Sequence, residues 1–303
     1  MNRSSVLTPL LFAIDNTGVV QWAIEIDPGS GATEPVLAGL AETPSGDILA
    51  VGQVHFDDVA GPLPSISGKN AWILRLRPDG TLVAGYALGG TGSEEATRVV
   101  AYPDGSYAIG GHLLRAPNVW LAALDATDGL RWSSSYRARP HADHLVDHTV
   151  LTGLAAIDDG MLACGTMEPP GTDSWLLRVA KGTGMPVWVK SLIGDAADVI
   201  HGDQLVAVVA LPVGLAACGR TEVNSVHGDI WVVRTSVDGN VTFLPDSGLA
   251  CRSTSPEWRR LDLDHDHSTH PLTPTAIAVT VDITADKVLE ARPAAAFGQL
   301  LTE

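Results

Sequence analysis

Four stretches of the chain share one pattern, in which a tryptophan opens a short apolar run and a glycine closes it. They read WILRLRPDG (Trp72 to Gly80), WLAALDATDG (Trp120 to Gly129), WLLRVAKGTG (Trp175 to Gly184) and WVVRTSVDG (Trp231 to Gly239). An apolar run that ends in Asp-Gly indicates a strand followed by a tight turn, because Asp and Gly tolerate the positive φ of such turns. Successive tryptophans lie about 50 residues apart, which marks an internal repeat.

A second aromatic residue follows the turn in three of the four stretches, namely Trp132, Trp188 and Phe243. Ala84 stands at this place in the first stretch. Near the N-terminus, LLFAIDNTGVVQW fits the same template without its first tryptophan, with Gly18 in the turn and Trp22 four residues later. Seven of the eight tryptophans therefore occupy two positions of one repeat, and Trp258 is the exception.

Another hairpin is predicted ahead of each repeated tryptophan, in LAETPSGDILAVG, VVAYPDGSYAIGG, GLAAIDDGMLACG and VVALPVGLAACG. The turns contain Gly46, Gly105, Gly160 and Gly214, and the second strands end at Gly52, Gly110, Gly165 and Gly219. Four antiparallel strands in one repeat of this length are typical of a β-propeller blade. Such a sheet is apolar on both faces, so it is stable only between neighbours.

We therefore expect an all-β fold, a β-propeller of four-stranded antiparallel blades. Propeller repeats are predicted over residues 1–250, as an N-terminal half-blade and four units at 35–88, 96–137, 148–193 and 204–246. The C-terminal segment 251–303 is expected to contain closing strands and a tail, because TAIAVTVDITADKVLEA (Thr275 to Ala291) alternates like two strands around a turn. Five blades would result, one of them shared by the two ends of the chain. The alternative is an excerpt of a longer ring.

The units resemble bacterial β-propeller repeats of the delta-60 or SBBP type, most closely in YPDGSYAIGG, DIWVVRTSVDGNV and NTGVVQW. The resemblance covers residues 7–246 and implies the fold. Such repeats occur in many exported or surface-associated bacterial proteins, and the resemblance supplies no catalytic residue. The chain departs from the pattern in the first segment, which lacks its tryptophan, and in the region after residue 250.

The composition excludes several functional classes. With 19 Lys and Arg against 35 Asp and Glu, the net charge is −16 at pH 7, so nucleic acid is not an expected partner. The longest apolar stretch, Leu205 to Gly219, is interrupted by Pro212 and is too short to span a membrane. Met1 to Phe12 lacks the pattern of a signal peptide, so we expect a cytoplasmic protein or a mature or excised part of an exported surface protein.

The three cysteines do not suggest a disulfide framework. Cys164 and Cys218 share one repeat position, which Val51 and Ile109 fill in the other units. A position that accepts Val, Ile and Cys is predicted to be a packed core site. Cys251 lies outside the repeat, and no neighbouring base marks it as a nucleophile.

One histidine cluster lies between two predicted units, in HADHLVDH. His141, His144, His148 and Asp143 together offer three imidazoles and a carboxylate, a set that suits a tetrahedral zinc site. The glutamate of an HExxH motif is absent. A solvated loop is the favoured interpretation, with a divalent cation as the alternative.

A second polar cluster, LDLDHDHSTH, alternates the carboxylates of Asp262, Asp264 and Asp266 with histidines. It resembles a calcium loop only in part, because His267 and Thr273 stand where an EF-hand requires Gly and Glu. A solvated linker is again favoured over a cation site.

Three arginines recur three residues after the repeated tryptophan, namely Arg75, Arg178 and Arg234. We interpret them as partners in contacts between strands or between blades. The Asp-Gly aspartates recur in register and are interpreted as turn residues, because a catalytic site seldom appears once per blade. The glycine-rich GGTGSEE is predicted to be a loop between blades, since it lacks the Lys-Ser/Thr ending of a phosphate-binding loop.

The favoured function is that of a non-enzymatic scaffold or binding module, which presents loops to a protein or glycan partner and is a candidate subunit of a larger assembly. The segments expected to touch a partner are Val54–Asn70 and residues 136–148. The alternative is a hydrolase or lyase with a metal site in the central funnel or in the loop that contains the histidines. The repetition favours the first, because a catalytic site must break the register locally.

Overall fold

The computed structural model describes residues 8–28, 32–56, 68–89, 93–113, 118–138, 148–168, 173–194, 204–221 and 229–240, and four short C-terminal strands within 251–278. Every regular element in these ranges is a β-strand. The all-β prediction is therefore confirmed.

Three consecutive sheets each contain four antiparallel strands in chain order. Sheet 1 contains β3 (Ala32–Glu42), β4 (Ile48–Phe56), β5 (Gly68–Leu76) and β6 (Leu82–Gly89). Sheet 2 contains β7 (Glu94–Ala101), β8 (Tyr107–Leu113), β9 (Asn118–Leu124) and β10 (Leu130–Ala138). Sheet 3 contains β11 (His148–Ile157), β12 (Gly160–Glu168), β13 (Asp173–Ala180) and β14 (Pro186–Gly194). The predicted four-stranded blade is therefore present three times.

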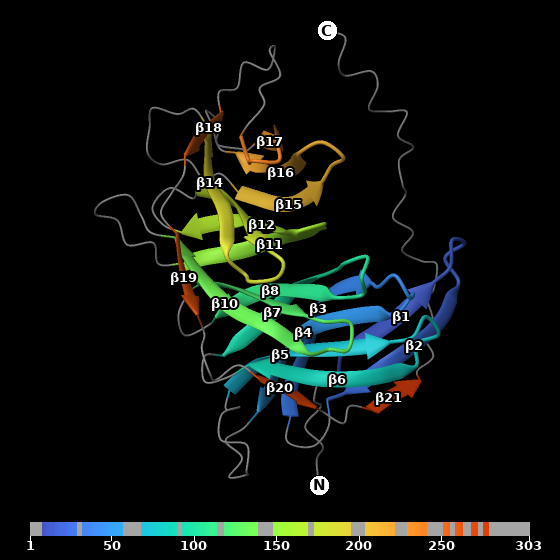
Figure 1. Ribbon diagram of the computed structural model, residues 1–303. Coiled ribbons are helices and arrows are strands. Elements are labelled where there is room, and N and C mark those ends of the chain that lie inside the picture. The colour runs from blue at the N-terminus through green and yellow to red at the C-terminus, as the bar shows by residue number, and fades with distance from the viewer. Residues whose placement is uncertain are drawn as a thin grey trace.

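The two ends of this row are shorter. The N-terminal sheet starts with the hairpin β1 (Leu10–Ile14) and β2 (Val20–Asp27), and sheet 4 contains β15 (Gln204–Ala210), β16 (Leu215–Thr221) and β17 (Asp229–Thr235). In Figure 1 the sheets follow one another from the N-terminal hairpin, in blue, to sheet 4, in orange. The first strands of these sheets, β3, β7, β11 and β15, are successive neighbours. The repeated sheets fit a propeller-like fold.

The repeated tryptophans have equivalent strand partners in each sheet. Each lies opposite a glycine of the second strand, in the pairs Trp72 and Gly52, Trp120 and Gly111, Trp175 and Gly165, and Trp231 and Gly219. A β-bulge in the first strand of the sheet lies beside each of these glycines. A Cβ on any of them would lie only 1.6 to 1.8 Å from a carbonyl oxygen of that strand. Only glycine fits opposite the bulge.

This register corrects one detail of the sequence interpretation. In sheet 2 the glycine opposite the tryptophan is Gly111 and not Gly110. Gly110, and not Ile109 as predicted, takes the position of Val51 and Cys164, which faces the next sheet, and a Cβ on Gly110 would lie 2.6 Å from the Leu151 side chain there. Two adjacent glycines could not be told apart by spacing alone.

The core consists of apolar layers between consecutive sheets. Each layer joins one face of a sheet to the opposite face of the next. The layer between sheets 2 and 3 includes Leu121, Trp132, Trp175 and Leu177, all buried. Both faces of sheets 2 and 3 are covered in this way, which is why their second and third strands are apolar at nearly every position.

The C-terminal strands follow the row backwards. They are β18 (Cys251–Thr254), β19 (Trp258–Asp262), β20 (Ser268–Pro271) and β21 (Thr275–Ala278), and they pair in turn with β14, β10, β6 and β2. The C-terminal segment does pair with the N-terminal hairpin, as expected. However, β21 lies on the outer side of β2 and not beside β1. Closure of the ring is not shown by the described strands.

The two ends of the sheets differ in their connections. Tight turns join the first strand to the second and the third to the fourth, and we call this side the turn end. The connections between second and third strands and between successive sheets lie on the opposite side, which we call the loop end. The turn-end connections are two to five residues long, whereas those at the loop end range from 4 to 11 residues.

Candidate functional site

Both segments predicted to touch a partner belong to the loop end. Residues 57–67 connect β4 to β5, and residues 139–147 connect β10 to β11. The strand ends that flank them are described, and Phe56 pairs with Gly68. The connections themselves lie outside the described residues. The strand ends that flank the two segments thus lie on one side of the sheets, although the segments are far apart in sequence.

A layer of buried polar side chains lies directly beneath the loop end. Its members are within three residues of the loop-end terminus of their strands: Gln53, Asn70, Asn118, Ser135 and Thr149. Each has a buried side-chain oxygen without a hydrogen-bond partner among the described residues. A buried oxygen without a partner costs about 1–3 kcal/mol, so this layer provides hydrogen-bonding capacity beneath the loops.

The polar layer was missed by the sequence interpretation, although a signal existed. Asn70 and Asn118 stand two residues before the repeated tryptophan, where the other units have Asp173 and Asp229. A polar residue recurring inside an apolar strand indicates a buried polar position. At the junction of sheets 1 and 2, the Asn70 Oδ1 and Glu94 Oε2 atoms both lie within 2.5 Å of the position that a Cβ on Gly89 would take.

The predicted metal ligands are not tested by the described residues. His141, Asp143, His144, Asp264 and Asp266 lie outside them. His148 begins β11 and Asp262 ends β19, but their side chains are not described. Within the described part of the chain, no group of three or more His, Cys, Asp or Glu residues could hold a metal ion.

Comparison with known proteins does not assign the chain to a family. A scan against known protein families found no match, and no curated protein matches the chain. The resemblance to delta-60 or SBBP repeats therefore stays a prediction from the repeat residues. Among the described residues there is no helix with the length and apolar character needed to cross a membrane.

At the turn end, the second aromatic residue of the repeat joins its sheet to the next at three of the four junctions. The indole N–H donates to a turn carbonyl of the following sheet, from Trp22 to Pro78 (2.8 Å), from Trp132 to Lys181 (2.7 Å) and from Trp188 to Val237 (3.1 Å). The rings lie on the turn glycines Gly80, Gly184 and Gly239, where a Cβ would be 2.7 to 2.9 Å from ring carbons. We call this contact the aromatic latch.

Trp132 offers a direct test of the latch. The Trp132→Ala variant removes a buried indole from the core and should lower the free energy of unfolding by about 3–5 kcal/mol. Trp132→Phe keeps most of the packing but loses the hydrogen bond to the Lys181 carbonyl. The lost hydrogen bond should cost about 1 kcal/mol, in addition to the cost of the smaller ring. Urea unfolding measures both. Equal losses in the two variants would contradict the role of the ring in the latch.

Sheets 1 and 2 are joined differently, because Ala84 replaces the aromatic residue. The turn of sheet 2 has Asp128, with φ +66°, at the place of the latch glycine. The sequence interpretation had placed Gly129 there. The Asp128 carboxylate accepts hydrogen bonds from Arg75 of sheet 1 (2.5 Å) and from the Tyr107 hydroxyl (2.9 Å). Without a ring over the turn, a side chain fits at this position.

Burial and charge act together in this cluster. Burial disfavours the Arg75 cation, but the hydrogen bond and the charge of Asp128 outweigh that effect and raise the pKa of Arg75. Burial raises the pKa of the Tyr107 phenol, and the Asp128 carboxylate raises it further. Arg75, Asp128 and Tyr107 are all buried. The cluster is consistent with a structural contact between sheets, because the phenol stays neutral and the ion pair is enclosed.

The prediction that the repeated arginines make contacts between strands or blades is confirmed for two of them. Arg75 bonds to Asp128 of the next sheet. Arg178 pairs with Asp159 of its own sheet (2.7 Å) and donates to the Val237 carbonyl of sheet 4 (3.3 Å). Arg234, in the last sheet, is exposed.

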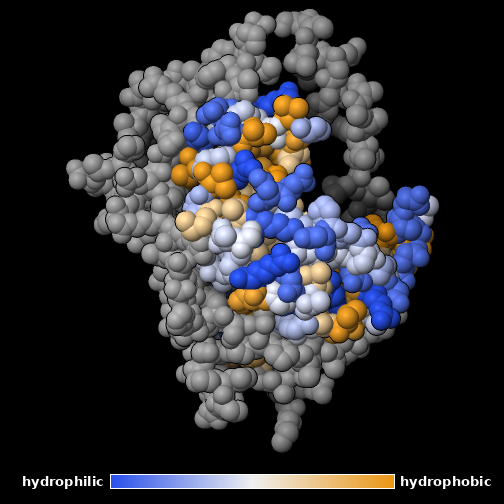
Figure 2. Space-filling model, viewed as in Figure 1, coloured by the Kyte–Doolittle hydropathy of each residue, from blue (hydrophilic) through white to orange (hydrophobic). Residues whose placement is uncertain are grey.

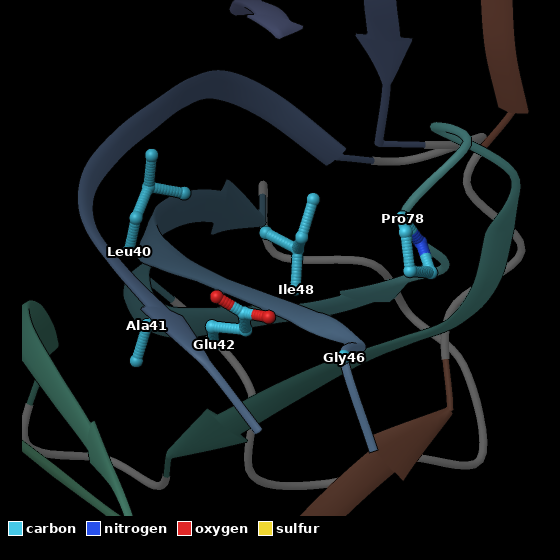
Figure 3. A pocket seen from close by; sticks show the side chains of 6 residues that line it. All are labelled: Leu40, Ala41, Glu42, Gly46, Ile48 and Pro78. Carbon is cyan, nitrogen blue, oxygen red and sulfur yellow. The ribbon is translucent and has the colours of Figure 1, made fainter. Parts of the chain in front are cut away.

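The turn end also contains shallow hollows. One of about 420 Å³ is lined by residues of β3, β4 and the turn after β5. Figure 3 shows Leu40, Ile48 and Pro78 around it, with Glu42 as its charged side chain. Ile48 packs on the core layer that faces the N-terminal hairpin, so the hollow opens on a face that this short sheet covers only in part. Its lining offers no group of converging catalytic side chains.

The cysteine prediction can be checked by thiol chemistry. Cys164 is buried in the layer between sheets 3 and 4, as its repeat position predicts. Burial raises the pKa of its thiol to about 12, so the reactive thiolate is scarce at neutral pH. We expect Cys164 to resist iodoacetamide at pH 8 in the folded protein and to react in urea. Peptide mass spectrometry reads both states, and rapid alkylation of folded protein at Cys164 would contradict the core assignment.

Proposed function

We propose that this chain is a non-enzymatic binding module that presents its loop end to a protein or glycan partner, alone or within a larger assembly. The observation that carries the proposal is the separation of connections, with tight, repeated turns on one side and the non-repeated segments on the other. Variable connections on a rigid repeat are where recognition usually occurs.

The buried polar layer supports the same proposal. Oxygens of Asn70, Asn118 and Thr149 lie beneath the loop end without partners among the described residues. They can bond to connecting segments or to water that a partner would complete. The acidic chain, with a net charge of −16, favours a partner surface that is neutral or cationic.

The test compares two loop replacements with a turn-end control. Residues 58–66 and, separately, 140–146 are replaced by Gly-Ser segments of equal length, and the control is Val213→Ser at an exposed turn-end position. Wild-type and variant proteins are used for pull-down from the native source and for a glycan array, and any partner is confirmed by direct binding with purified components. We expect binding to survive in the control and to be lost in at least one loop variant.

Binding that survives both loop replacements, or that is lost equally in the control, would contradict the proposal. Metal analysis addresses the enzymatic alternative. A stoichiometric transition metal that disappears on substitution of His144 and His148 would favour a hydrolase or lyase.

A further inference from the structure

Each sheet of the row has two distinct faces, which the repeat positions identify. In β5, Ala71 and Ile73 face sheet 2, whereas Trp72 and Leu74 face the N-terminal sheet. We call these the forward face and the backward face. In sheets 1 to 3 the apolar residues at these positions of the third strand are buried on both faces.

The backward face of the N-terminal hairpin is uncovered. Leu10, Phe12 and Ile14 of β1 occupy the repeat positions of Trp72, Leu74 and Leu76. They are 45%, 45% and 53% exposed, whereas their three counterparts in sheet 1 are fully buried. The other face of β1 is covered, since Leu11 packs against sheet 1. One apolar face thus lacks the neighbour that the repeat provides elsewhere.

The forward face of sheet 4 is uncovered in the matching way. Ile230 and Val232 of β17 hold the positions of Ala71 and Ile73, and they are 88% and 69% exposed. Val209 of β15 is also exposed on this sheet. Figure 2 shows hydrophobic side chains at the surface towards both ends of the row. Together, these two faces have the apolar residues of one core layer between neighbouring sheets.

A turn glycine of the N-terminal hairpin that lacks its aromatic ring supports the same pairing of the two faces. Gly80, Gly184 and Gly239 each lie under an aromatic ring of the preceding sheet. The equivalent N-terminal turn has Gly18, with φ +85°, and no described atom lies within 4 Å of a Cβ placed there. The sheet that would precede it in a ring is sheet 4. Its aromatic repeat residue is Phe243, which lies outside the described residues.

We propose that sheet 4 of the same chain packs its forward face on the backward face of the N-terminal hairpin, so that five sheets close into a ring. The two faces belong to one tethered chain, which gives them an effective concentration far above that of a second molecule. Five sheets lie within the range of known propeller rings. Closure buries large apolar side chains that are 45% to 88% exposed in the described chain.

The decisive experiment is thiol cross-linking across the proposed contact. In a chain whose native cysteines are replaced (Cys164→Val, Cys218→Val, Cys251→Ser), Phe12→Cys is combined with Val232→Cys and treated with a short bismaleimide. The control pair joins Phe12→Cys to Val187→Cys, since Val187 is similarly exposed but belongs to sheet 3. We expect a cross-link within the monomer for the first pair, at least tenfold faster than for the control.

A cross-link found only in dimers would overturn the proposal in favour of a second copy, and equal rates for the two pairs would overturn it altogether. A measurement on a nearly native chain guards against variants that fail to fold. Cys218 faces forward in sheet 4 and is half-buried in the described arrangement. In the Cys251→Ser chain, closure predicts that Cys218 is as protected from alkylation as Cys164, in a species that sediments as a monomer. Alkylation of Cys218 at the rate of an accessible thiol would contradict closure.

Discussion

Gly165→Ala is expected to lower the free energy of unfolding by at least about 3 kcal/mol. The added Cβ would lie 1.8 Å from the Val150 carbonyl oxygen and 2.7 Å from the ring of Trp175. Neither atom can move easily, because one is backbone at the bulge and the other belongs to a fully buried indole. Urea unfolding followed by tryptophan fluorescence measures the effect.

The matched control is Gly182→Ala, in the turn between β13 and β14. No described atom lies within 4 Å of a Cβ there, and its φ is not positive. We expect a change within about 0.5 kcal/mol. If both alanines proved equally harmless, the steric role of the glycine opposite the bulge would have to be abandoned.

The second large effect concerns the exceptional joint between sheets 1 and 2. Asp128→Gly removes the partner of a buried guanidinium and should cost about 3–5 kcal/mol. Ala84→Trp alone should also destabilise, because its ring would meet the Asp128 side chain where the other sheets have glycine. The double variant restores the aromatic latch. Arg75 can then bond as Arg178 does, to a turn carbonyl and to the aspartate of its own sheet.

We therefore expect the double variant to be more stable than the sum of the two single changes, by about 2 kcal/mol. A double-mutant cycle from urea unfolding gives this coupling energy. Strictly additive losses would mean that residues 84 and 128 do not form one joint. The control cycle pairs Ala84→Trp with Gly129→Ala, because Gly129 lies beside the turn position and not on it.

The sequence was sufficient for the repeated features of the fold. Tryptophan spacing and the turn glycines predicted four-stranded antiparallel sheets, because burial on both faces and positive φ leave characteristic residues. The register of the strands could not be predicted from the sequence to the single residue. Gly110 and Gly111 are adjacent, as are Asp128 and Gly129, and only the bulge and the hydrogen bond from Asp128 to Asp125 distinguish them.

Other features depend on contacts that spacing does not encode. The reversed course of β18 to β21 along the outer edges leaves no repeat signature, since an edge strand is held chiefly by backbone hydrogen bonds. The buried polar layer interrupts apolar strands at only one or two positions each, so that the strands still read as apolar. At the candidate site, topology places the strand ends that flank the two predicted loops on one side of the sheets, whereas the loops themselves lie outside the described residues.

Hydrogen–deuterium exchange of the whole chain, followed by mass spectrometry, tests most directly whether equivalent sheets support one another. Protection should rise and fall once per repeat, with maxima of similar height in β4 and β5, β8 and β9, and β12 and β13, the inner pairs covered by neighbours on both faces. Protection confined to one part of the row, with sheet 2 or sheet 3 exchanging freely while its neighbours stay protected, would contradict the account.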